Sequence, residues 1–432
     1  MKKITTRALS VLLLAALIVG GLGIYVLRYV VHGREWALYF AQLNSSSSGE
    51  LTDRSGAILA SFSGKGNYFA EDPFTRTANF HVTGDYWGRT GTGLLSGYAR
   101  GLNRFSLLTG TTRYHNSRLR LSIDAGLNSM AYDALDGRKG TVAIVNYTNG
   151  ELLCMVSSPS VDPADPEAVP ADGAYINRCL SASFVPGSVF KLVTAAAAIE
   201  NIPDLEERSF YCYGSTEIAG VEIKCSGTHY TQSFEDALAN SCNVAFSKLA
   251  VMLGQDTMIR YVRQYGFLDG HSLDGIPTAA GSYPLDFVGD PETGWSGIGQ
   301  STDLVNPYAL LRFVSAIANG GVLCEPSLIL DGKPPEMSRL LEKPTADKLK
   351  EMMAYNVTAH YGGEESFPGL RLCAKTGTAE VGDGTSHAWF TGFLDDPEHP
   401  YAFVVLVENG GGGLTNAGPV ARNVLQWAVE RF

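Results

Sequence analysis

The sequence predicts an α+β fold in which one antiparallel sheet is flanked by helices and interrupted by a long helical insert. Two observations support this fold class. Strand-like segments lie at both ends of the region from residue 118 to residue 432, and helix-like segments fill its middle. In addition, 45% of the 432 residues are hydrophobic, enough for one large domain plus a smaller module. We therefore expect the first and last strands to meet in one sheet.

Residues 1–28 are expected to form a cytoplasmic N-terminus and a transmembrane anchor. Basic residues precede an apolar run from Ala8 to Leu27, which Arg28 closes. A helix of about 20 residues spans about 30 Å, the thickness of a bilayer core. The basic flank favours a cytoplasmic N-terminus, with the rest of the chain on the extracytoplasmic side. A cleaved signal peptide is the alternative, although its apolar region would be shorter.

Residues 29–117 are expected to form a small N-terminal module, followed by a large domain over residues 118–432. The polar patch from Asn44 to Ser48 indicates a loop or linker. A turn followed by an apolar run occupies Leu51 to Ala60. Dense glycines between Gly84 and Gly101 argue against one long helix in this region.

The large domain is expected to open with a strand, a helix and a β-hairpin. The strand covers Leu121 to Asp124 and runs into a helix from Ala125 to Leu135. Thr141 to Asn146 and Glu151 to Val156 are strand-like, and the Asn149-Gly150 pair between them is a strong hairpin signal.

Helices are expected in the middle of the large domain and strands near its end. The helices cover Ser188 to Ala198, Phe234 to Leu253 and Tyr308 to Asn319. Three strands and a final helix follow, over Arg371 to Thr378, Ala388 to Phe393, Ala402 to Val407 and Val420 to Arg431.

Composition argues against several classes of function. The net charge of −11 disfavours nucleic-acid binding. Of the seven cysteines, Cys212 and Cys225 are the best candidates for a disulfide, because the glycines between them suit a hairpin or tight loop. Sequence does not determine the connectivity, so their state stays open. No C-x-x-C pair or clustered His/Cys spacing indicates a metal, and no cofactor is expected.

Three short motifs bear on the chemistry of the chain. They occur once each, in the order Ser188-Val-Phe-Lys191, Ser241-Cys-Asn243 and Lys375-Thr-Gly-Thr378. Any one of them is a weak signal, since short patterns recur by accident. Together they are typical of acyl-transferring serine enzymes.

Ser188 and Lys191 have the types and the spacing of a nucleophile and its base. Residues three apart lie on one helix face, so the lysine amine can reach the hydroxyl. A serine hydroxyl needs such a base to become an effective nucleophile. Lysine acts as a base only when its pKa falls from about 10.4 to roughly 7–8, through burial or a nearby cation such as Lys375.

The second motif supplies polar groups beside this pair. The Ser241 hydroxyl can pass a proton between Lys191 and a leaving amine, and the Asn243 amide can hold a peptide carbonyl. Each residue alone also has a structural interpretation, as a helix cap, a turn residue or a solvated charge. Their joint occurrence favours chemistry.

The third motif suits substrate binding on a strand. Lys375 and Thr376 can recognise a terminal carboxylate. Gly377 is expected to leave room for a substrate backbone that pairs with the strand edge. The backbone N–H groups of Ser188 and Thr378 can form an oxyanion hole.

These motifs resemble those of the class B penicillin-binding proteins, the monofunctional peptidoglycan transpeptidases. The resemblance covers nearly the whole chain from about Leu51 onwards and implies the penicillin-binding transpeptidase fold. Further segments that resemble the family are Asp53-Arg-Ser-Gly56, Asn177-Arg-Cys-Leu180, Phe184-Val-Pro-Gly-Ser-Val-Phe-Lys191, Trp295-Ser-Gly-Ile-Gly-Gln-Ser301, Ala318-Asn-Gly-Gly321 and His387-Ala-Trp-Phe390. The chain is shorter than typical members.

The resemblance implies that the penultimate D-Ala of a stem pentapeptide acylates Ser188, with Lys191 as general base and Ser241 as proton relay. Asn243 and the segment from Lys375 to Thr378 would bind substrate. An amine of a neighbouring stem would then attack the acyl-enzyme and complete the cross-link. β-Lactams would trap Ser188. The implied partner is a membrane glycan polymerase of the shape, elongation, division and sporulation family, and the N-terminal module would be non-catalytic.

Three rival functions share these motifs. A serine β-lactamase is one, but Glu235-Asp-Ala-Leu-Ala239 departs from the class A deacylating pattern E-x-x-L-N at its last position. A D,D-carboxypeptidase would use water as acceptor, and its low-mass forms usually anchor through the C-terminus. A non-catalytic scaffold or β-lactam sensor would have lost a motif residue or carry additional membrane helices.

Overall fold

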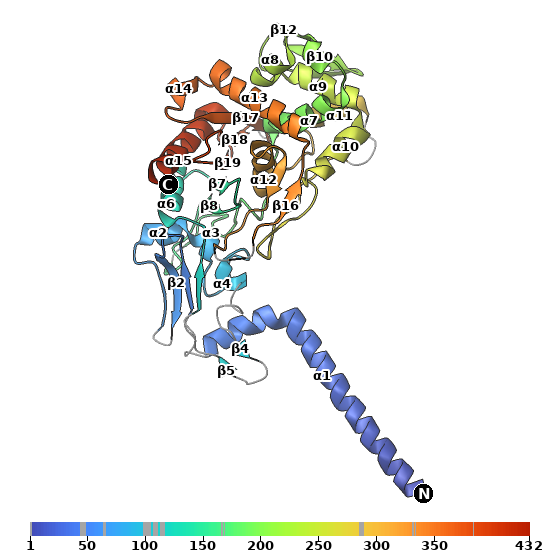
Figure 1. Ribbon diagram of the computed structural model, residues 1–432, viewed down its shortest axis with the longest axis vertical. Helices are drawn as coiled ribbons and strands as arrows, with labels where there is room; N and C mark the ends of the chain where they lie inside the picture. The colour runs from blue at the N-terminus through green and yellow to red at the C-terminus, as the bar shows by residue number, and fades with distance from the viewer. Residues whose placement is uncertain are drawn as a thin grey trace.

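The chain forms a long N-terminal helix, a small β-sheet module and a large α+β domain, in that order (Figure 1). The computed structural model describes residues 2–43, 49–63, 66–97, 105–106, 111–112, 117–165, 167, 169–284, 289–330, 332, 334–382 and 384–432. The polar patch from Asn44 to Ser48 lies outside the described residues.

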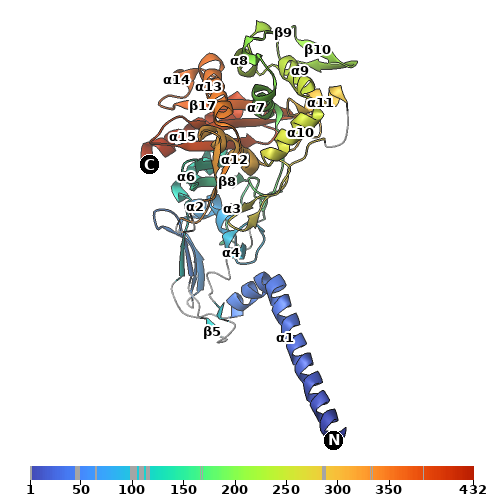
Figure 2. The same cartoon turned by 45° about the vertical axis from the view of Figure 1, so that its right-hand side comes forward.

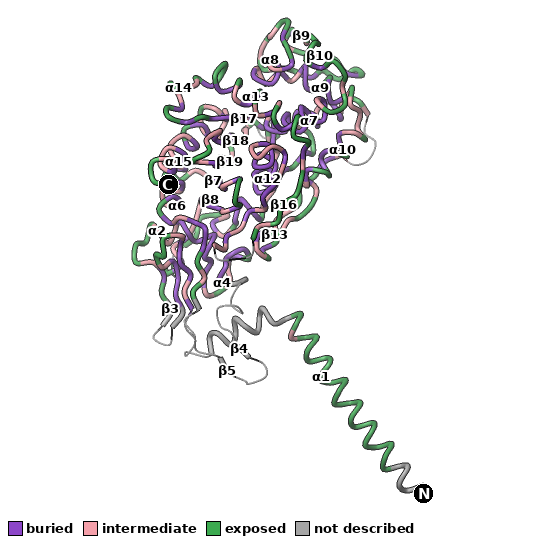
Figure 3. The backbone as a smooth tube through the Cα atoms, in the orientation of Figure 1, coloured by how far each residue is buried: buried purple, intermediate pink, exposed green. Residues whose placement is uncertain are grey.

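The N-terminal helix α1 (Lys2–Leu43) extends away from the rest of the molecule (Figure 1). Its segment Arg7–Val31 has a mean hydropathy of 2.5, and Figure 3 shows this segment almost entirely exposed. An exposed apolar surface of this length is unfavourable in water and favourable in a bilayer. Among the described residues it is the one helix long and apolar enough to cross a membrane, which confirms the predicted anchor helix.

A four-stranded sheet in the order β3-β2-β1-β6 organises the small module. β1 pairs antiparallel with β2 and parallel with β6. Its strands are β1 (Gly49–Thr52), β2 (Ile58–Ser63), β3 (Gly66–Phe69) and β6 (Ser117–Arg120). The other described elements are α2 (Pro73–Ala78), α3 (Phe80–Thr83), α4 (Leu94–Gly97), β4 (Phe105–Ser106) and β5 (Thr111–Thr112).

The strand predicted over Leu121–Asp124 is displaced in the structure. The strand β6 ends just before this segment and belongs to the sheet of the small module. Residue 118, where the large domain was expected to begin, therefore lies inside β6. The Leu121 N–H donates to the Thr52 carbonyl at 2.8 Å, and Asp124 caps the helix α6 (Ala125–Leu135). The apolar pattern indicated an extended chain correctly, but a pattern does not specify which strand will pair with it.

The large domain is built on a five-stranded antiparallel sheet in the order β17-β18-β19-β7-β8. β7 pairs with β19, so the strands from the two ends of the domain meet as the sequence predicts. The turn at Asn149-Gly150 joins β7 to β8, with Gly150 at a φ of 77°. The five strands are β7 (Gly140–Asn146), β8 (Leu152–Ser158), β17 (Leu372–Glu380), β18 (Ser386–Leu394) and β19 (Tyr401–Val407).

Helices cover both faces of this sheet, and alternate residues of each strand therefore enter different cores. Val142 and Ile144 of β7 pack in the core formed with α6 and with α15 (Gly418–Arg431). Ala143 and Val145 pack in the other core, which contains α12 (Pro307–Ala318). Figures 1 and 2 show the two helical layers on either side of the strands.

A helical insert connects β8 to the last three strands. It contains η1 (Gly187–Phe190), α7 (Lys191–Asn201), η2 (Leu205–Glu207), α8 (Phe234–Ala239), α9 (Asn243–Leu253), α10 (Gln255–Gln264), α11 (Asp290–Ser296), α12, α13 (Lys343–His360) and α14 (Gly363–Ser366). Its short strands are β9 (Phe210–Cys212), β10 (Ser215–Ile218), β11 (Val221–Lys224), β12 (Tyr230–Gln232), β13 (Ser272–Leu273), β14 (Ile276–Pro277), β15 (Val322–Cys324) and β16 (Met337–Arg339). A short π-helix, η3 (Gly413–Ala417), leads into α15.

The helix predicted over Phe234–Leu253 is two helices in the structure. α8 ends at Ala239 and α9 begins at Asn243. Between them, Ser241 has a φ of 52°, a left-handed conformation that interrupts a right-handed helix. The break falls on the second motif and decides where its side chains point.

Candidate functional site

The three motifs meet at the start of α7, although they are far apart in the sequence. The Lys191 amine lies 2.8 Å from the Ser188 Oγ and 3.2 Å from the Ser241 Oγ. The Lys375 amine lies 3.1 Å from the same Ser241 hydroxyl. Side chains from all three motifs are thus linked by hydrogen bonds in the order Ser188, Lys191, Ser241 and Lys375.

Ser188 sits in a tight turn of 3₁₀ helix, η1, which continues directly into α7. The turn is held from outside, because the Trp389 indole N–H donates to the Val185 carbonyl at 2.9 Å and the Gly187 N–H donates to the Gly299 carbonyl at 2.8 Å. Ser188 is half-buried, whereas Lys191 is completely buried. The nucleophile candidate therefore faces an accessible space while its base is shielded from water.

Replacing Gly187 with alanine is expected to misplace Ser188. Gly187 has a φ of 55°, and a Cβ there would lie 2.6 Å from the Thr378 carbonyl oxygen and 2.9 Å from the Ala379 Cα. Backbone atoms cannot rotate away, so the turn must shift, and a shift of about 1 Å can cost about 10² in rate. We expect acylation by penicillin, measured by stopped-flow fluorescence, to slow by about that factor.

Gly137→Ala is the matched control for this variant. Gly137 also has a positive φ, 71°, but no atom lies within 4 Å of its added Cβ. An alanine at this position has the unfavourable free energy of a left-handed backbone, about 1 kcal/mol, but its Cβ does not collide with other atoms. Equal acylation rates in the two variants would contradict a role for the close contact at Gly187.

The second motif surrounds the Lys191 amine with acceptors. This amine donates to the Ser241 carbonyl at 2.7 Å and to the Asn243 Oδ1 at 2.7 Å, in addition to the two serine hydroxyls. The left-handed backbone at Ser241 turns both its carbonyl and its hydroxyl towards Lys191. The Asn243 amide nitrogen donates to the Lys224 carbonyl at 2.9 Å, which fixes the orientation of the amide.

The third motif lies on β17, the edge strand of the sheet, next to η1. Lys375 is completely buried, Thr376 is half-buried and Thr378 is exposed, so within the motif only the threonines reach solvent. The Tyr361 hydroxyl lies 3.2 Å from both the backbone nitrogen and the Oγ1 of Thr376. An edge strand with exposed side chains at this end can pair with an extended ligand.

Gly377 also serves packing in the structure, a role that the sequence does not predict. A Cβ at Gly377 would lie 3.0 Å from the Pro186 carbonyl oxygen, 3.0 Å from the Val189 Cγ1 and 3.1 Å from the Trp389 Cβ. The missing side chain therefore lets β17 approach the turn that holds Ser188. Whether a substrate backbone also approaches Gly377 along the strand edge stays a prediction.

Burial sets the electrostatics of the two lysines. Removal from water lowers the pKa of Lys191 to about 7. Burial also lowers the pKa of Lys375 well below its ordinary value, and the positive charge of Lys191 adds to that effect. The sequence offers burial or a nearby cation such as Lys375 as the cause of a low pKa at Lys191, and in the structure that cause is burial.

Several supporting residues escape prediction from the sequence. Tyr361, Trp389, Gly299 and Gly413 each hold a motif in place, and Gly413 does so by donating its N–H to the Thr378 Oγ1 at 3.3 Å. Trp389 and Gly299 lie in segments that resemble the family, and this resemblance was the only indication in the sequence that they matter. The pairing of Tyr361 with Thr376 depends on how α13 packs beside β17.

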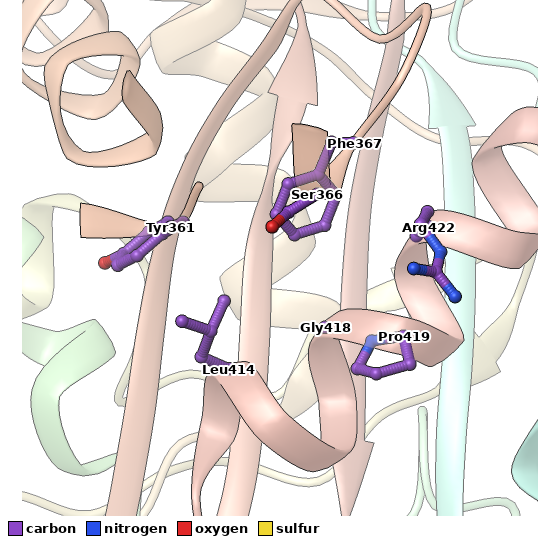
Figure 4. Close-up of a pocket in the computed structure, with 7 residues that line it drawn as sticks. All are labelled: Tyr361, Ser366, Phe367, Leu414, Gly418, Pro419 and Arg422. Carbon is purple, nitrogen blue, oxygen red and sulfur yellow. The ribbon is translucent and has the colours of Figure 1, made fainter. Parts of the chain in front are cut away.

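A pocket of about 150 Å³ lies beside Tyr361, on the side of the sheet covered by α15 (Figure 4). It is lined by Tyr361, Ser366, Phe367, Leu414, Gly418, Pro419 and Arg422. None of these residues belongs to the three motifs. Tyr361 is therefore the contact between this pocket and the third motif.

Comparison with known families identifies the family and the fold. A family model described as the penicillin binding protein transpeptidase domain matches residues 140–426, which include all three motifs. The chain belongs to this family. The predicted resemblance to the class B penicillin-binding proteins is confirmed, and so is the predicted fold.

Curated relatives carry names that agree with this assignment. Stage V sporulation protein D of Bacillus subtilis is 30% identical over 344 residues, which cover 71% of this chain and 53% of the relative. The peptidoglycan D,D-transpeptidase PbpA of Mycobacterium tuberculosis is 30% identical over 349 residues, which cover 71% of this chain and 70% of the relative. This chain thus spans about half the length of the first relative.

Solved structures share the fold. The crystal structure of PBPA from M. tuberculosis has a TM-score of 0.78 at 24% identity and covers 89% of this chain and 100% of its own. Pseudomonas aeruginosa PBP2, in complex with WCK 5153, has a TM-score of 0.74 at 25% identity and covers 88% and 96% of the two chains. For the M. tuberculosis protein, a penicillin G acyl-enzyme complex is known.

Proposed function

We propose that this protein is a membrane-anchored serine D,D-transpeptidase that cross-links peptidoglycan stem peptides through an acyl-enzyme on Ser188. The observation that supports it best is the hydrogen-bonded chain from Ser188 through Lys191 and Ser241 to Lys375. These hydrogen-bonded side chains lie beside the edge strand β17, and the two lysines are completely buried. A proton can therefore pass between the side chains without involving bulk water.

In the acylation step, the neutral Lys191 amine removes the proton of the Ser188 hydroxyl. The Ser188 oxygen then attacks the carbonyl of the penultimate D-Ala and forms an ester as the amide bond breaks. The proton passes from Lys191 through the Ser241 hydroxyl to the leaving nitrogen of the terminal D-Ala. Two hydrogen bonds, Lys191 to Ser188 and Lys191 to Ser241, already join the protein groups that this transfer needs.

In the second step, an amine of a neighbouring stem attacks the ester, and the proton path runs in the opposite direction. The extended donor peptide would pair with the edge of β17. Lys375 and Thr376 would recognise the carboxylate of the substrate, and the Asn243 amide would hold a peptide carbonyl. Backbone N–H groups of Ser188 and Thr378 would stabilise the oxyanion, where one lost donor typically costs about 10²–10³ in rate.

The pH dependence of acylation follows from the depressed pKa of Lys191, about 7. Below this pH the amine is protonated and cannot accept the Ser188 proton. The second-order rate constant for penicillin should therefore rise about tenfold per pH unit below about pH 7 and level off above it. Stopped-flow labelling over this range tests it, and a flat profile would exclude Lys191 as the base.

The choice of acceptor separates the transpeptidase from its rivals. The purified full-length protein should exchange the terminal D-Ala of a pentapeptide donor for a fluorescent D-amino acid, as read by mass spectrometry. Release of D-Ala with water as the acceptor, and no incorporation of the fluorescent D-amino acid, would indicate a D,D-carboxypeptidase. Rapid turnover of a chromogenic cephalosporin would indicate a β-lactamase. Absence of any acyl-enzyme would favour a non-catalytic scaffold, whereas a stable penicillin acyl-enzyme without exchange or hydrolysis of the pentapeptide would favour a sensor.

The topology and the partner belong to the same proposal. Lys2, Lys3 and Arg7 on the N-terminal flank of the anchor favour a cytoplasmic N-terminus and an extracytoplasmic large domain. A membrane glycan polymerase of the shape, elongation, division and sporulation family is the proposed partner. A Helicobacter pylori PBP2, with a TM-score of 0.66, is known in complex with MreC. Reporter fusions at the two ends of α1 test the orientation.

A further inference from the structure

Three cysteines and a histidine converge beside the second motif. Cys212, Cys225, His229 and Cys242 each offer one ligand atom, and these atoms all lie within 4.8 Å of one another. They come from the end of β9, the loop after β11, the loop before β12 and the start of α9, in the upper part of Figures 1 and 2. We propose that these four side chains bind a zinc ion that holds the second motif in position.

The distances within the cluster fit a tetrahedral site. With Zn–S bonds of about 2.3 Å, two sulfurs of such a site stand about 3.8 Å apart. The Cys225 Sγ lies 3.9 Å from the Cys242 Sγ and 3.6 Å from the His229 Nδ1. All seven cysteines are free thiols, so the disulfide considered for Cys212 and Cys225 is absent from this structure.

The surroundings of the sulfurs suit metal-bound thiolates. The Asn243 N–H donates to the Cys225 Sγ at 3.3 Å, and the Ala245 N–H donates to the Cys242 Sγ at 3.4 Å. Such donors stabilise negative charge on a ligand and orient it. Three sulfurs and one imidazole nitrogen favour Zn²⁺ over Mg²⁺ or Ca²⁺, which prefer oxygen. Four protein ligands leave no open position, so the ion is structural.

The local architecture explains why a metal would be useful here. The β9–β12 and β10–β11 ribbons are two-stranded and only three or four residues long, a size that is marginally stable without further support. A single ion would tie both ribbons to α9. A metal that joins segments in this way contributes directly to their folding.

The cysteine–histidine cluster is also connected to the residues around the Lys191 amine. Cys242 lies between Ser241 and Asn243, which both contact the Lys191 amine, and the Asn243 amide donates to the carbonyl of Lys224, next to Cys225. Fixing Cys225 and Cys242 to one ion therefore fixes the acceptors around Lys191. The four ligands are positioning residues, since none of them touches Ser188 or Lys375.

The full-length protein, purified in detergent from medium that contains Zn²⁺, is expected to hold one zinc per chain by plasma mass spectrometry. Cys212→Ser and His229→Ala should lower its affinity for Zn²⁺, measured against a chelating dye, by at least about 10–100-fold. His229→Cys should retain the ion, which separates ligation from a general folding defect. Cys324→Ser and Cys373→Ser are matched controls outside the cluster and should keep full zinc.

Replacing Zn²⁺ by Co²⁺ should give the visible bands of a tetrahedral thiolate site, and chelation should slow penicillin acylation by at least about tenfold. Ser188→Ala should keep its zinc while losing acylation, so the metal site and the proposed enzyme activity can fail independently. A zinc-free protein, unchanged zinc affinity in Cys212→Ser, or a disulfide between any two of the cluster cysteines would each overturn the proposal.

Discussion

Replacing Ser188 with alanine is expected to abolish covalent labelling by a fluorescent penicillin and to leave the fold intact. In the proposed mechanism the ester forms on the Ser188 oxygen, which lies closer to the Lys191 amine than the Ser241 hydroxyl does, at 2.8 Å against 3.2 Å. Loss of the nucleophile in a serine acyl-transfer enzyme costs on the order of 10⁶ in rate. Gel fluorescence after hours of exposure, and the D-amino acid exchange assay, should both fall to background.

Ser181→Ala provides the matched control for this experiment. Ser181 is exposed and precedes the same turn, but it lies outside the three motifs. It should label at the parental rate, and both variants should show the parental circular dichroism. A stable label on Ser188→Ala would mean that another residue carries the acyl group and would contradict the assignment.

Replacing Lys191 with methionine is expected to slow acylation by about 10²–10⁴, the usual contribution of a positioned general base. Methionine has a similar length and fills the buried space without charge. It leaves the Ser241 carbonyl and the Asn243 Oδ1 without the donor that they now share. The loss should appear in the acylation rate constant, and the rise in rate near pH 7 should disappear.

Lys248→Met removes an exposed lysine of α9 and serves as the control. Surface substitutions of this kind usually change stability by less than about 0.5 kcal/mol. The control should keep both the rate and its pH profile. A Lys191→Met variant with the same rise near pH 7 would show that another group titrates in the parent protein.

Much of the large domain could be predicted from periodicity and turn residues. The strands Thr141–Asn146 and Ala402–Val407 were predicted almost to their ends, since buried strands read as continuous apolar runs bounded by turns. The pairing of the two ends of the domain followed from the order of elements. The candidate catalytic residues could be named because three ordered motifs seldom coincide by accident.

The errors occur where long-range contacts overrule local preference. The break at Ser241 has no glycine or proline to signal it, and the left-handed backbone is maintained by the hydrogen bonds from Lys191. The helical pattern of Phe234–Leu253 continues through it unchanged. The packing role of Gly377 was missed for a similar reason, since its close neighbours Pro186, Val189 and Trp389 lie at other positions of the sequence.

The cysteine cluster illustrates the same limit. Its spacing, Cys-x12-Cys-x3-His-x12-Cys, contains no short metal-binding pattern. Only the folding of two short ribbons against α9 brings the four side chains together. A disulfide between Cys212 and Cys225 was the natural expectation from the loop between them, because sequence shows a separation along the chain and not a distance in space.

The sequence by itself predicted the apolar N-terminal helix, the fold class, the family and the candidate reacting side chains, because each depends on local pattern or on ordered motifs. The tertiary structure alone decided which of these side chains are buried, and with that the low pKa of Lys191. It also decided which atoms surround Gly187 and Gly377 and leave no space for a Cβ, and which cysteines lie close together. The physical reason is that desolvation and close packing depend on neighbours supplied by distant parts of the chain.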